Sequence, residues 1–271
     1  MPELPEVETV RTYLEPLLAG RRFERVEISD PRLVRPYEPR AVAAELEGER
    51  VAAVERRGKY LIVRFVSGLA LLVHLRMTGG FPKLPATHER AVLTLDDGTR
   101  VSYRDVRRFG TWEVHDRAAA ADYLAGRLGP EPLGPGFTKA FLRERLAGRT
   151  APVKAAILDQ RAVAGLGNIY ADESLWRARL HPRRPAGDLA ADEIDRLHRG
   201  IRDALRRGIA VEGTDLGDGV YASGSMQDEL HVYGRGGEPC DRCGTAIAKT
   251  RVAGRGTWFC PRCQPEVRPR P

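Results

Sequence analysis

The residues best suited to chemistry stand at the start of the chain, in Pro2-Glu3-Leu4-Pro5-Glu6. If Met1 is removed, the secondary amine of Pro2 becomes the free N-terminus. An α-amino group titrates at about pH 8, so roughly a tenth of it is neutral at pH 7, whereas a lysine titrates at about 10.4. A neutral secondary amine can attack a sugar carbon and form an iminium ion, an electron sink. Glu3 and Glu6 place carboxylates beside it for proton transfer. The alternative is an ordinary helix start.

Four cysteines form the second chemical signal. They stand as Cys240-x2-Cys243 and Cys260-x2-Cys263, with sixteen residues between the pairs. This spacing suits one tetrahedral, structural zinc ion. Disulfides would need an oxidising compartment, which nothing else indicates, and a redox or iron–sulfur use is the remaining alternative. Arg255 lies near the tip of the hairpin between the pairs, where it is either functional or a solvated turn residue.

Several residues could bind phosphate. The segment 165–168 (GLGN) predicts a turn and then a helix, with Asn168 as a candidate N-cap, and a helix start attracts anions. A plain tight turn gives the same pattern. Lys154, one helix earlier, could reach the same phosphate or be an ordinary exposed lysine. Lys59 follows Gly58, and glycine allows another backbone to approach closely. The alternative is that Lys59 belongs to a basic run on a solvated face, as most such runs do.

Two strand ends carry an apolar side chain beside arginines. Met77 follows His74 in one glycine turn, and Phe109 follows Arg108 in another. Apolar side chains held out beside arginines suit a wedge driven between stacked bases. The alternatives are core positions for Met77 and Phe109 and a satisfied strand histidine for His74.

A helix and a run of short strands must position these residues. Apolar residues at helical spacing predict a helix from Pro5 that ends near Gly20. Short β-rich runs follow at 23–28, 51–57, 60–66, 70–76, 91–95, 100–104 and 111–115. Short strands with tight turns predict a β-sandwich or barrel rather than a parallel sheet, with the helix packed along it.

Glycine and proline break this pattern at 130–136, which predicts a semi-rigid interdomain linker. We therefore expect an α+β, multidomain chain. A sandwich domain spans 1–129, a helical domain 137–225 and a zinc module 232–267. Helices are expected near 141–146, 153–158, 168–176 and 189–205. The polar, glycine-rich stretch 213–229 predicts a mobile loop.

The charge balance favours an anionic partner. The chain has 44 Lys+Arg against 37 Asp+Glu, a net charge of +7, and the stretch from Val232 onward carries eight basic and three acidic residues. Such a balance fits nucleic-acid binding without proving it. No apolar run approaches the ~18 residues that span a bilayer, and the N-terminus is unlike a signal peptide. We expect a soluble, cytosolic monomer.

Assembled in order, these residues resemble the formamidopyrimidine-DNA glycosylases, bacterial base-excision repair enzymes for oxidised purines. The resemblance runs from the opening PELPEVET through segments 58–60, 74–79, 107–110, 158–160, 165–171 and 232–235 to the last cysteine pair. It implies a β-sandwich, a helix–two-turn–helix domain and a zinc-finger hairpin. It also implies a partner, double-stranded DNA with oxidised bases or abasic sites, held in the cleft between domains.

The resemblance further implies that Pro2 attacks C1′ of a flipped nucleotide, and that β- and δ-elimination then cut the strand. Glu3 would be the general acid/base, and Glu6 would support the amine and base pocket. Met77 and Phe109 would fill the vacated stack while Arg108 pairs with the orphaned cytosine. Phosphate contacts would come from Lys59, His74, Asn168 and Arg255. The implied catalytic set is Pro2, Glu3, Lys59 and Arg255; the implied DNA-binding set is Glu6, His74, Met77, Arg108, Phe109, Lys154 and Asn168.

Two alternatives remain at this point. The endonuclease VIII branch acts on oxidised pyrimidines with the same fold and nucleophile, but Leu4 and the loop at 107–110 match the purine branch. A non-catalytic, structure-specific DNA-binding protein with a zinc module would explain the charge and the phosphate sites. It gives no reason for Pro2 beside two glutamates, and incision of a lesion-bearing duplex separates it from an enzyme.

Overall fold

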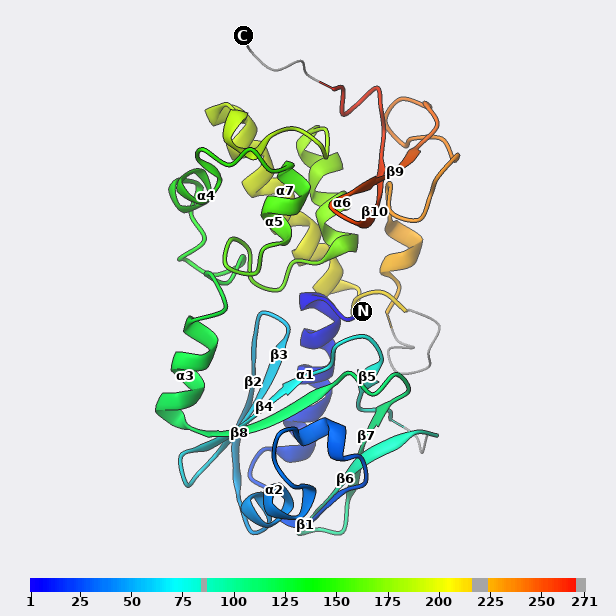
Figure 1. Cartoon of the computed structure of the whole chain (residues 1–271). Helices are drawn as coiled ribbons and strands as arrows, with labels where there is room; N and C mark the ends of the chain where they lie inside the picture. The colour runs from blue at the N-terminus through cyan, green and yellow to red at the C-terminus, as the bar shows by residue number, and fades with distance from the viewer. Residues whose placement is uncertain (84–86, 216–223, 267–271) are drawn as a thin grey trace. The chain divides into compact units, whose positions relative to one another are not determined.

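A computed structural model of the chain describes residues 1–83, 87–215 and 224–266. Its contacts divide the chain into two units, Met1–Gly126 with Glu212–Gly224 and Arg127–Val211 with Ser225–Pro271 (Figure 1). The segment Glu212–Gly224, which we expected in the helical domain, therefore groups with the first unit. Part of the expected mobile loop, 216–223, lies outside the described residues, whereas Met226–Glu229 forms a short 3-10 helix, η3.

The first unit opens with helix α1, Leu4–Leu18, directly after Glu3. Proline in the first turn suits a helix start, where its missing N–H costs no hydrogen bond. The apolar residues of the helix lie on one buried face: Leu4, Val7, Val10, Leu14 and Leu18. This face joins the core formed by both sheets, so the expected helix packed along the sandwich is confirmed.

Two antiparallel four-stranded sheets face each other in this unit (Figure 1). One has the order β1-β6-β7-β5, and the other β2-β3-β4-β8. The strands of the first sheet are Phe23–Ile28, Glu89–Leu95, Arg100–Asp105 and Gly79–Gly80. Those of the second are Val51–Arg57, Tyr60–Phe65, Leu69–His74 and Thr111–Asp116. The sandwich is confirmed, and among the residues described in this unit the short strand β5 is the one addition to the seven expected strands.

Aromatic side chains pack between the sheets. The rings of Phe23 in β1 and Phe65 in β3 meet edge to face at 5.4 Å, and Tyr103 in β7 meets Trp112 in β8 in the same way at 5.4 Å. Such pairs add to the free energy gained by burying their area. In the described part of this unit, three helical segments were not expected from the sequence, because their patterns are short or alanine-rich: η1 Pro31–Val34, α2 Pro39–Leu46 and α3 Arg117–Ala125.

The second unit contains the expected helices. They are α4 Lys139–Leu146, α5 Val153–Leu158, α6 Asn168–Ala178 and α7 Ala191–Ala210, with the short 3-10 helix η2 at Ala186–Asp188. Helices α6 and α7 pack closely because Gly200 lets the backbones approach: a Cβ there would lie 2.7 Å from the carbonyl oxygen of Ser174. The predicted linker is held against α7, where the Arg202 guanidinium donates to the carbonyls of Pro132, Leu133 and Gly134.

A two-stranded hairpin follows near the C-terminus. Strand β9, Ala248–Val252, pairs antiparallel with β10, Arg255–Phe259. The turn between them has left-handed backbone at Ala253 (φ 47°) and Gly254 (φ 75°), and it presents Arg255 as an exposed residue at the start of β10. Within the described ranges, no helix is long and apolar enough to cross a membrane.

Candidate functional site

The start of α1 is buried and held in place by Glu6. Pro2 is buried, and Glu3 and Glu6 are 2% and 1% exposed. One carboxylate oxygen of Glu6 accepts the N–H of Glu3 at 2.8 Å, and the other accepts the N–H of Thr214 at 2.9 Å. A Cβ on Gly213 would lie 2.8 Å from Glu6 Oε1, so glycine allows this turn to pack against Glu6.

Through these hydrogen bonds Glu6 connects the N-terminus to the turn at Gly213-Thr214. The interpretation of Glu6 as a supporting residue agrees with these bonds, because both of its oxygens accept backbone N–H groups. The nitrogen of Pro2 is acylated while Met1 remains on the chain, and removal of Met1 frees it as a secondary amine. The roles of Pro2 and Glu3 in catalysis stay predictions.

His74 is kept neutral at the end of β4. It is 8% exposed, and the Tyr60 ring meets it edge-on at 4.7 Å. Burial, with smaller effects from the cations Arg76 and Lys59, lowers the pKa of His74 to about 3. Its Nδ1 accepts the N–H of Arg76 at 3.0 Å, so the ring proton sits on Nε2. The predicted phosphate contact would therefore be an uncharged N–H donor, with Lys59, itself 6% exposed, supplying positive charge nearby.

Asp105 ties together the two loops that carry the predicted wedge residues. It is 1% exposed. Its Oδ1 accepts the Thr78 hydroxyl at 2.5 Å and its Oδ2 accepts the N–H of Gly110 at 2.7 Å, while Thr78 Oγ1 accepts the N–H of Arg107 at 2.9 Å. Sequence reasoning missed both Asp105 and Thr78. The available signal was an aspartate that ends a strand directly before a glycine-containing loop.

Each loop contains an arginine in a strained, left-handed backbone conformation. Arg76 and Arg108 adopt left-handed conformations, with φ of 56° and 60°, which cost free energy for residues with side chains. Phe109 is 52% exposed, and the Arg107 guanidinium lies over its ring at 4.9 Å. The core alternative is thus wrong for Phe109, whereas Met77 is half-buried.

Tyr103 explains the glycines in these two loops. A Cβ added at Gly79 or at Gly110 would overlap the Tyr103 hydroxyl. That hydroxyl is buried and has no hydrogen-bond partner among the residues described. Its position against two glycine backbones brings the loops close to β7 and limits both sites to glycine.

In the second unit, Lys154 is neither exposed nor presented to a ligand. Its side chain is 0% exposed and its Nζ lies 2.7 Å from Asp172 Oδ1. The ammonium also donates to Gly256 O at 2.9 Å and Thr257 Oγ1 at 2.8 Å. Burial raises the pKa of Asp172 to about 7, although Lys154 opposes this rise. The alternative of an exposed lysine is therefore wrong. These three acceptors surround the Lys154 ammonium, so the side chain fixes β10 to α5 and α6. This corrects our expectation that Lys154 contacts a phosphate directly.

Asn168 also contacts the hairpin. Helix α6 has Gly167 as its N-cap and makes no side-chain cap bond, so the predicted N-cap at Asn168 is wrong. The side chain of Asn168 instead donates from Nδ2 to Gly256 O at 3.0 Å, and its Oδ1 has no partner in the described part of the chain. Asn168 and Lys154 thus both donate to the carbonyl of Gly256 in β10, the residue directly after Arg255.

The four cysteines come together as one cluster. Their sulfur atoms all lie within 4.8 Å of one another, with Cys240–Cys263 at 4.0 Å and Cys243–Cys260 at 3.5 Å. A tetrahedral zinc with Zn–S bonds of about 2.3 Å separates its sulfurs by roughly 3.8 Å, whereas a disulfide needs about 2.05 Å. The cluster fits one zinc ion, and none of the four cysteines takes part in a disulfide.

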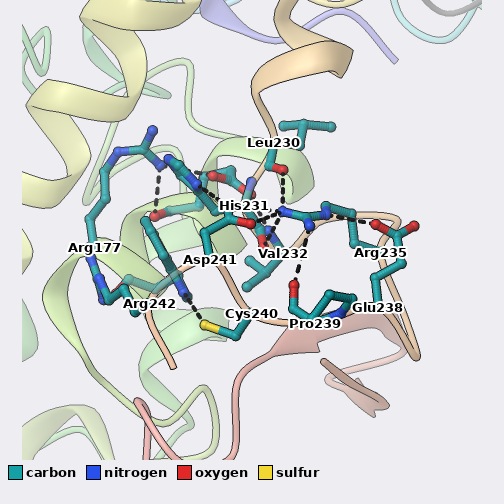
Figure 2. Close-up of polar contacts among 12 residues, drawn as sticks. Arg177, Leu230, His231, Val232, Arg235, Glu238, Pro239, Cys240, Asp241 and Arg242 are labelled. Carbon is teal, nitrogen blue, oxygen red and sulfur yellow. Dashed lines mark hydrogen bonds and ion pairs between the residues drawn. The ribbon is translucent and has the colours of Figure 1, made fainter. Parts of the chain in front are cut away.

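A polar network attaches the segment before the zinc module to α6. The carboxylate of Glu173, which is 0% exposed, accepts the backbone N–H groups of His231, Val232 and Tyr233 at 2.9–3.2 Å. Figure 2 shows Arg235 reaching the carbonyls of Leu230, His231 and Pro239 and the carboxylates of Glu238 and Asp241. Sequence reasoning noted the segment 232–235 but not this anchoring.

Trp176 at the end of α6 supports the metal cluster directly. Its ring is stacked on His231 at 4.0 Å, and Arg242 lies over it at 3.6 Å. Its Nε1 donates to Cys240 Sγ at 3.5 Å. A donor that hydrogen-bonds a metal ligand orients that ligand, and no sequence pattern indicated this one.

Three family models match successive parts of the chain. Residues 1–112 match the formamidopyrimidine-DNA glycosylase N-terminal domain, and residues 128–218 match the H2TH domain of the same enzymes. Residues 237–265 match the zinc finger found in FPG and IleRS. Together with the cysteine cluster, this match establishes one structural zinc.

Similar proteins cover nearly the whole chain. A formamidopyrimidine-DNA glycosylase of Symbiobacterium thermophilum is 50% identical over 275 residues, covering 98% of this chain and 90% of its own. A solved complex of the LlFpg protein with THF-DNA and an inhibitor superposes with a TM-score of 0.92 at 40% identity, covering 98% and 100%. Another, of wild-type Lactococcus lactis Fpg with DNA containing an oxidised pyrimidine, has a TM-score of 0.91 at 40% identity and the same coverage.

Proposed function

The chain belongs to the formamidopyrimidine-DNA glycosylase family, and on that premise we propose that it removes oxidised purines from duplex DNA and cuts the strand through an iminium intermediate on Pro2. Membership makes it a DNA glycosylase of base-excision repair with AP lyase activity. Its partner is double-stranded DNA carrying oxidised bases or abasic sites. We propose a location in the bacterial cytosol and nucleoid, where that substrate lies.

The observation that carries the proposal is the buried start of α1. Removal of Met1 frees the Pro2 nitrogen, which forms a bond to C1′ as the bond from C1′ to the damaged base breaks. Opening of the sugar ring leaves the C1′–N iminium ion. Loss of a proton from C2′ then breaks the C3′–O bond and expels the 3′ phosphate, and loss of a proton from C4′ breaks the C5′–O bond and expels the 5′ phosphate. Glu3 is the proton carrier in these steps, and Glu6 keeps the helix start in place through Glu3 and Thr214.

Each unit contributes residues that bind the phosphates of the DNA backbone. In the first unit, Lys59 and the neutral Nε2–H of His74 bind phosphate; in the second, Asn168 and the exposed Arg255 do so. Phosphate contacts position a protein without selecting sequence, as suits an enzyme that must find lesions anywhere. Met77 and the exposed Phe109 fill the gap left by the flipped nucleotide, whose unstacking costs a few kcal/mol.

Borohydride trapping tests this function. The substrate is a duplex with 8-oxoguanine opposite cytosine, and the proteins are wild type with Met1 removed, Pro2→Gly, Glu3→Gln and, as a matched control, Glu24→Gln at an exposed position of β1. We expect a covalent adduct on the Pro2 peptide with wild type and Glu24→Gln, and a sharp reduction with the other two.

Two other results would redirect the proposal. An adduct with an oxidised pyrimidine but not with 8-oxoguanine would reassign the substrate to oxidised pyrimidines. The solved complex of Lactococcus lactis Fpg with DNA containing an oxidised pyrimidine is the reason to include this substrate in the test. Tight binding without any adduct would favour the non-catalytic DNA-binding alternative and remove the role of Pro2.

A further inference from the structure

Arg108 is held by a buried carboxylate that the sequence did not single out. Its Nε donates to Asp30 Oδ2 at 2.5 Å and its Nη2 to Asp30 Oδ1 at 2.7 Å. The Asp30 side chain is 4% exposed, whereas that of Arg108 is 38% exposed. The two residues come from different segments, the turn after β1 and the loop after β7, and both belong to the first unit.

The pair leaves one edge of the guanidinium available. Asp30 occupies the side formed by Nε and Nη2, and Nη1 contacts no acceptor in the described part of the chain. Because a guanidinium is planar with five N–H donors in fixed directions, the Nη1–Nη2 edge keeps two adjacent donors that face away from Asp30. The exposed part of Arg108 can thus meet a ligand while the pair stays intact.

Asp30 is itself fixed. Its Oδ1 also accepts the N–H of Arg32 at 3.1 Å, which caps the short helix η1, and Arg90 Nε lies 3.9 Å from Oδ2. The hydrogen bonds from Arg108 lower the pKa of Asp30 despite its burial, so the carboxylate is charged at neutral pH. A rigid, charged acceptor gives Arg108 one orientation.

We propose that Asp30 is a positioning residue that orients Arg108 so that its free edge selects cytosine opposite the lesion. The inference rests on the proposed function and on the contact between Arg108 and the orphaned cytosine that the family resemblance implies. Cytosine presents two adjacent acceptors, N3 and O2, on its pairing edge. Adenine, guanine and thymine each present a donor next to an acceptor there. Two adjacent fixed donors therefore match cytosine and oppose a donor on each of the other bases.

The opposite role, in which Asp30 competes with the base for Arg108, is less consistent with the geometry. Release of Arg108 would leave a 4% exposed carboxylate with Arg90 at 3.9 Å as its remaining cation among those described here. Asp30 would keep the N–H of Arg32 but lose both hydrogen bonds to its ion partner, and a buried charge without a hydrogen-bonded ion partner is costly. Competition also predicts that loss of Asp30 strengthens DNA binding, so the effect of an Asp30 substitution on the dissociation constant distinguishes the two roles.

The test measures binding to four duplexes that carry a tetrahydrofuran abasic analogue opposite C, A, G or T. The readout is the ratio of dissociation constants opposite each other base and opposite C, which does not depend on the fraction of active protein. The variants are Asp30→Asn, Asp30→Ser, Arg108→Ala and the double variant Asp30→Asn/Arg108→Ala. Asparagine and serine both cap helices well, so η1 keeps its cap while the two-bond pair is lost.

We expect wild type to prefer C by about tenfold or more, since a matched two-bond contact discriminates between bases on that scale. Asp30→Asn and Asp30→Ser should lose most of this preference, and the double variant should match Arg108→Ala. An unchanged ratio in the Asp30 variants, no preference in wild type, or tighter binding of Asp30→Asn to all four duplexes would overturn the inference.

Excision of 8-oxoguanine is measured in parallel to separate this inference from the proposed function. Excision with an unchanged binding ratio would remove the role of Asp30 alone. A ratio that changes as expected without any excision would remove the proposed catalysis and leave the positioning role in place.

Discussion

Asp105→Asn should uncouple the loops that carry Met77 and Phe109. In the native protein the buried Asp105 carboxylate accepts the Thr78 hydroxyl and the N–H of Gly110. Asparagine has nearly the same shape but one acceptor oxygen and no charge, so its NH₂ group must face either the N–H of Gly110 or the Thr78 hydroxyl. In the first orientation two donors face each other, and in the second the Thr78 hydroxyl must turn its own proton away from the asparagine. In both, a hydrogen bond to a charged acceptor is lost and a buried donor loses its partner.

The magnitude follows from those two contacts. A hydrogen bond to a charged group contributes about 1.5–3 kcal/mol, and an unsatisfied buried donor costs about 1–3 kcal/mol. We therefore expect the loops to lose about 2 kcal/mol or more of local stability. Since about 1.4 kcal/mol is a factor of ten, the Gly110 amide should exchange its hydrogen at least ~30-fold faster.

Amide hydrogen exchange followed by mass spectrometry, on peptides covering residues 75–81 and 105–111, measures this effect. The matched control is Asp96→Asn, the same substitution at an exposed turn of the same unit, which should leave both peptides unchanged. Incision of lesion-bearing duplex should fall in Asp105→Asn and not in the control. Unchanged exchange in both peptides of Asp105→Asn would refute the coupling, whatever happens to activity.

Three further predictions concern single contacts. In the folded protein the pKa of His74 is about 3, whereas in the unfolded chain it is about 6.5. The unfolded chain therefore binds a proton at this residue first, and wild type loses stability as the pH falls. Between pH 7 and pH 5 this residue should contribute about 2 kcal/mol of that loss. Urea unfolding of His74→Gln at both pH values should show a smaller loss, and equal losses would contradict the assignment. Lys154→Met leaves its buried aspartate partner unpaired, which costs about 3–5 kcal/mol; hydrogen exchange across residues 248–259 should accelerate, and an unchanged hairpin would argue against the anchoring role. Gly110→Ala should lower the melting temperature because its Cβ overlaps the Tyr103 hydroxyl, and adding Tyr103→Phe should recover much of the loss. The same rescue should fail for Gly79→Ala, whose Cβ would also lie 2.5 Å from the Leu75 carbonyl oxygen.

Local patterns in the sequence predicted what depends on neighbours along the chain. The cysteine spacing predicted the zinc cluster because two turns of this kind place four sulfurs together with little help from the rest of the fold. Short β-rich runs separated by tight turns predicted the strands of the sandwich because strand propensity and turn residues are read from neighbours along the chain. The PELPEVET opening likewise indicated both the helix start and the candidate nucleophile.

Contacts between distant segments were decided by the tertiary structure. Glu6 and Thr214 are 208 positions apart, and Asp30 and Arg108 are 78 apart. No local pattern distinguishes these carboxylates from surface ones. Lys154 shows the same limit: a helical lysine near a glycine turn looked solvent-exposed or phosphate-binding, yet the fold buries it against Asp172. A charged side chain can be buried wherever partners arrive to pair with it, and only the packed chain determines where they arrive.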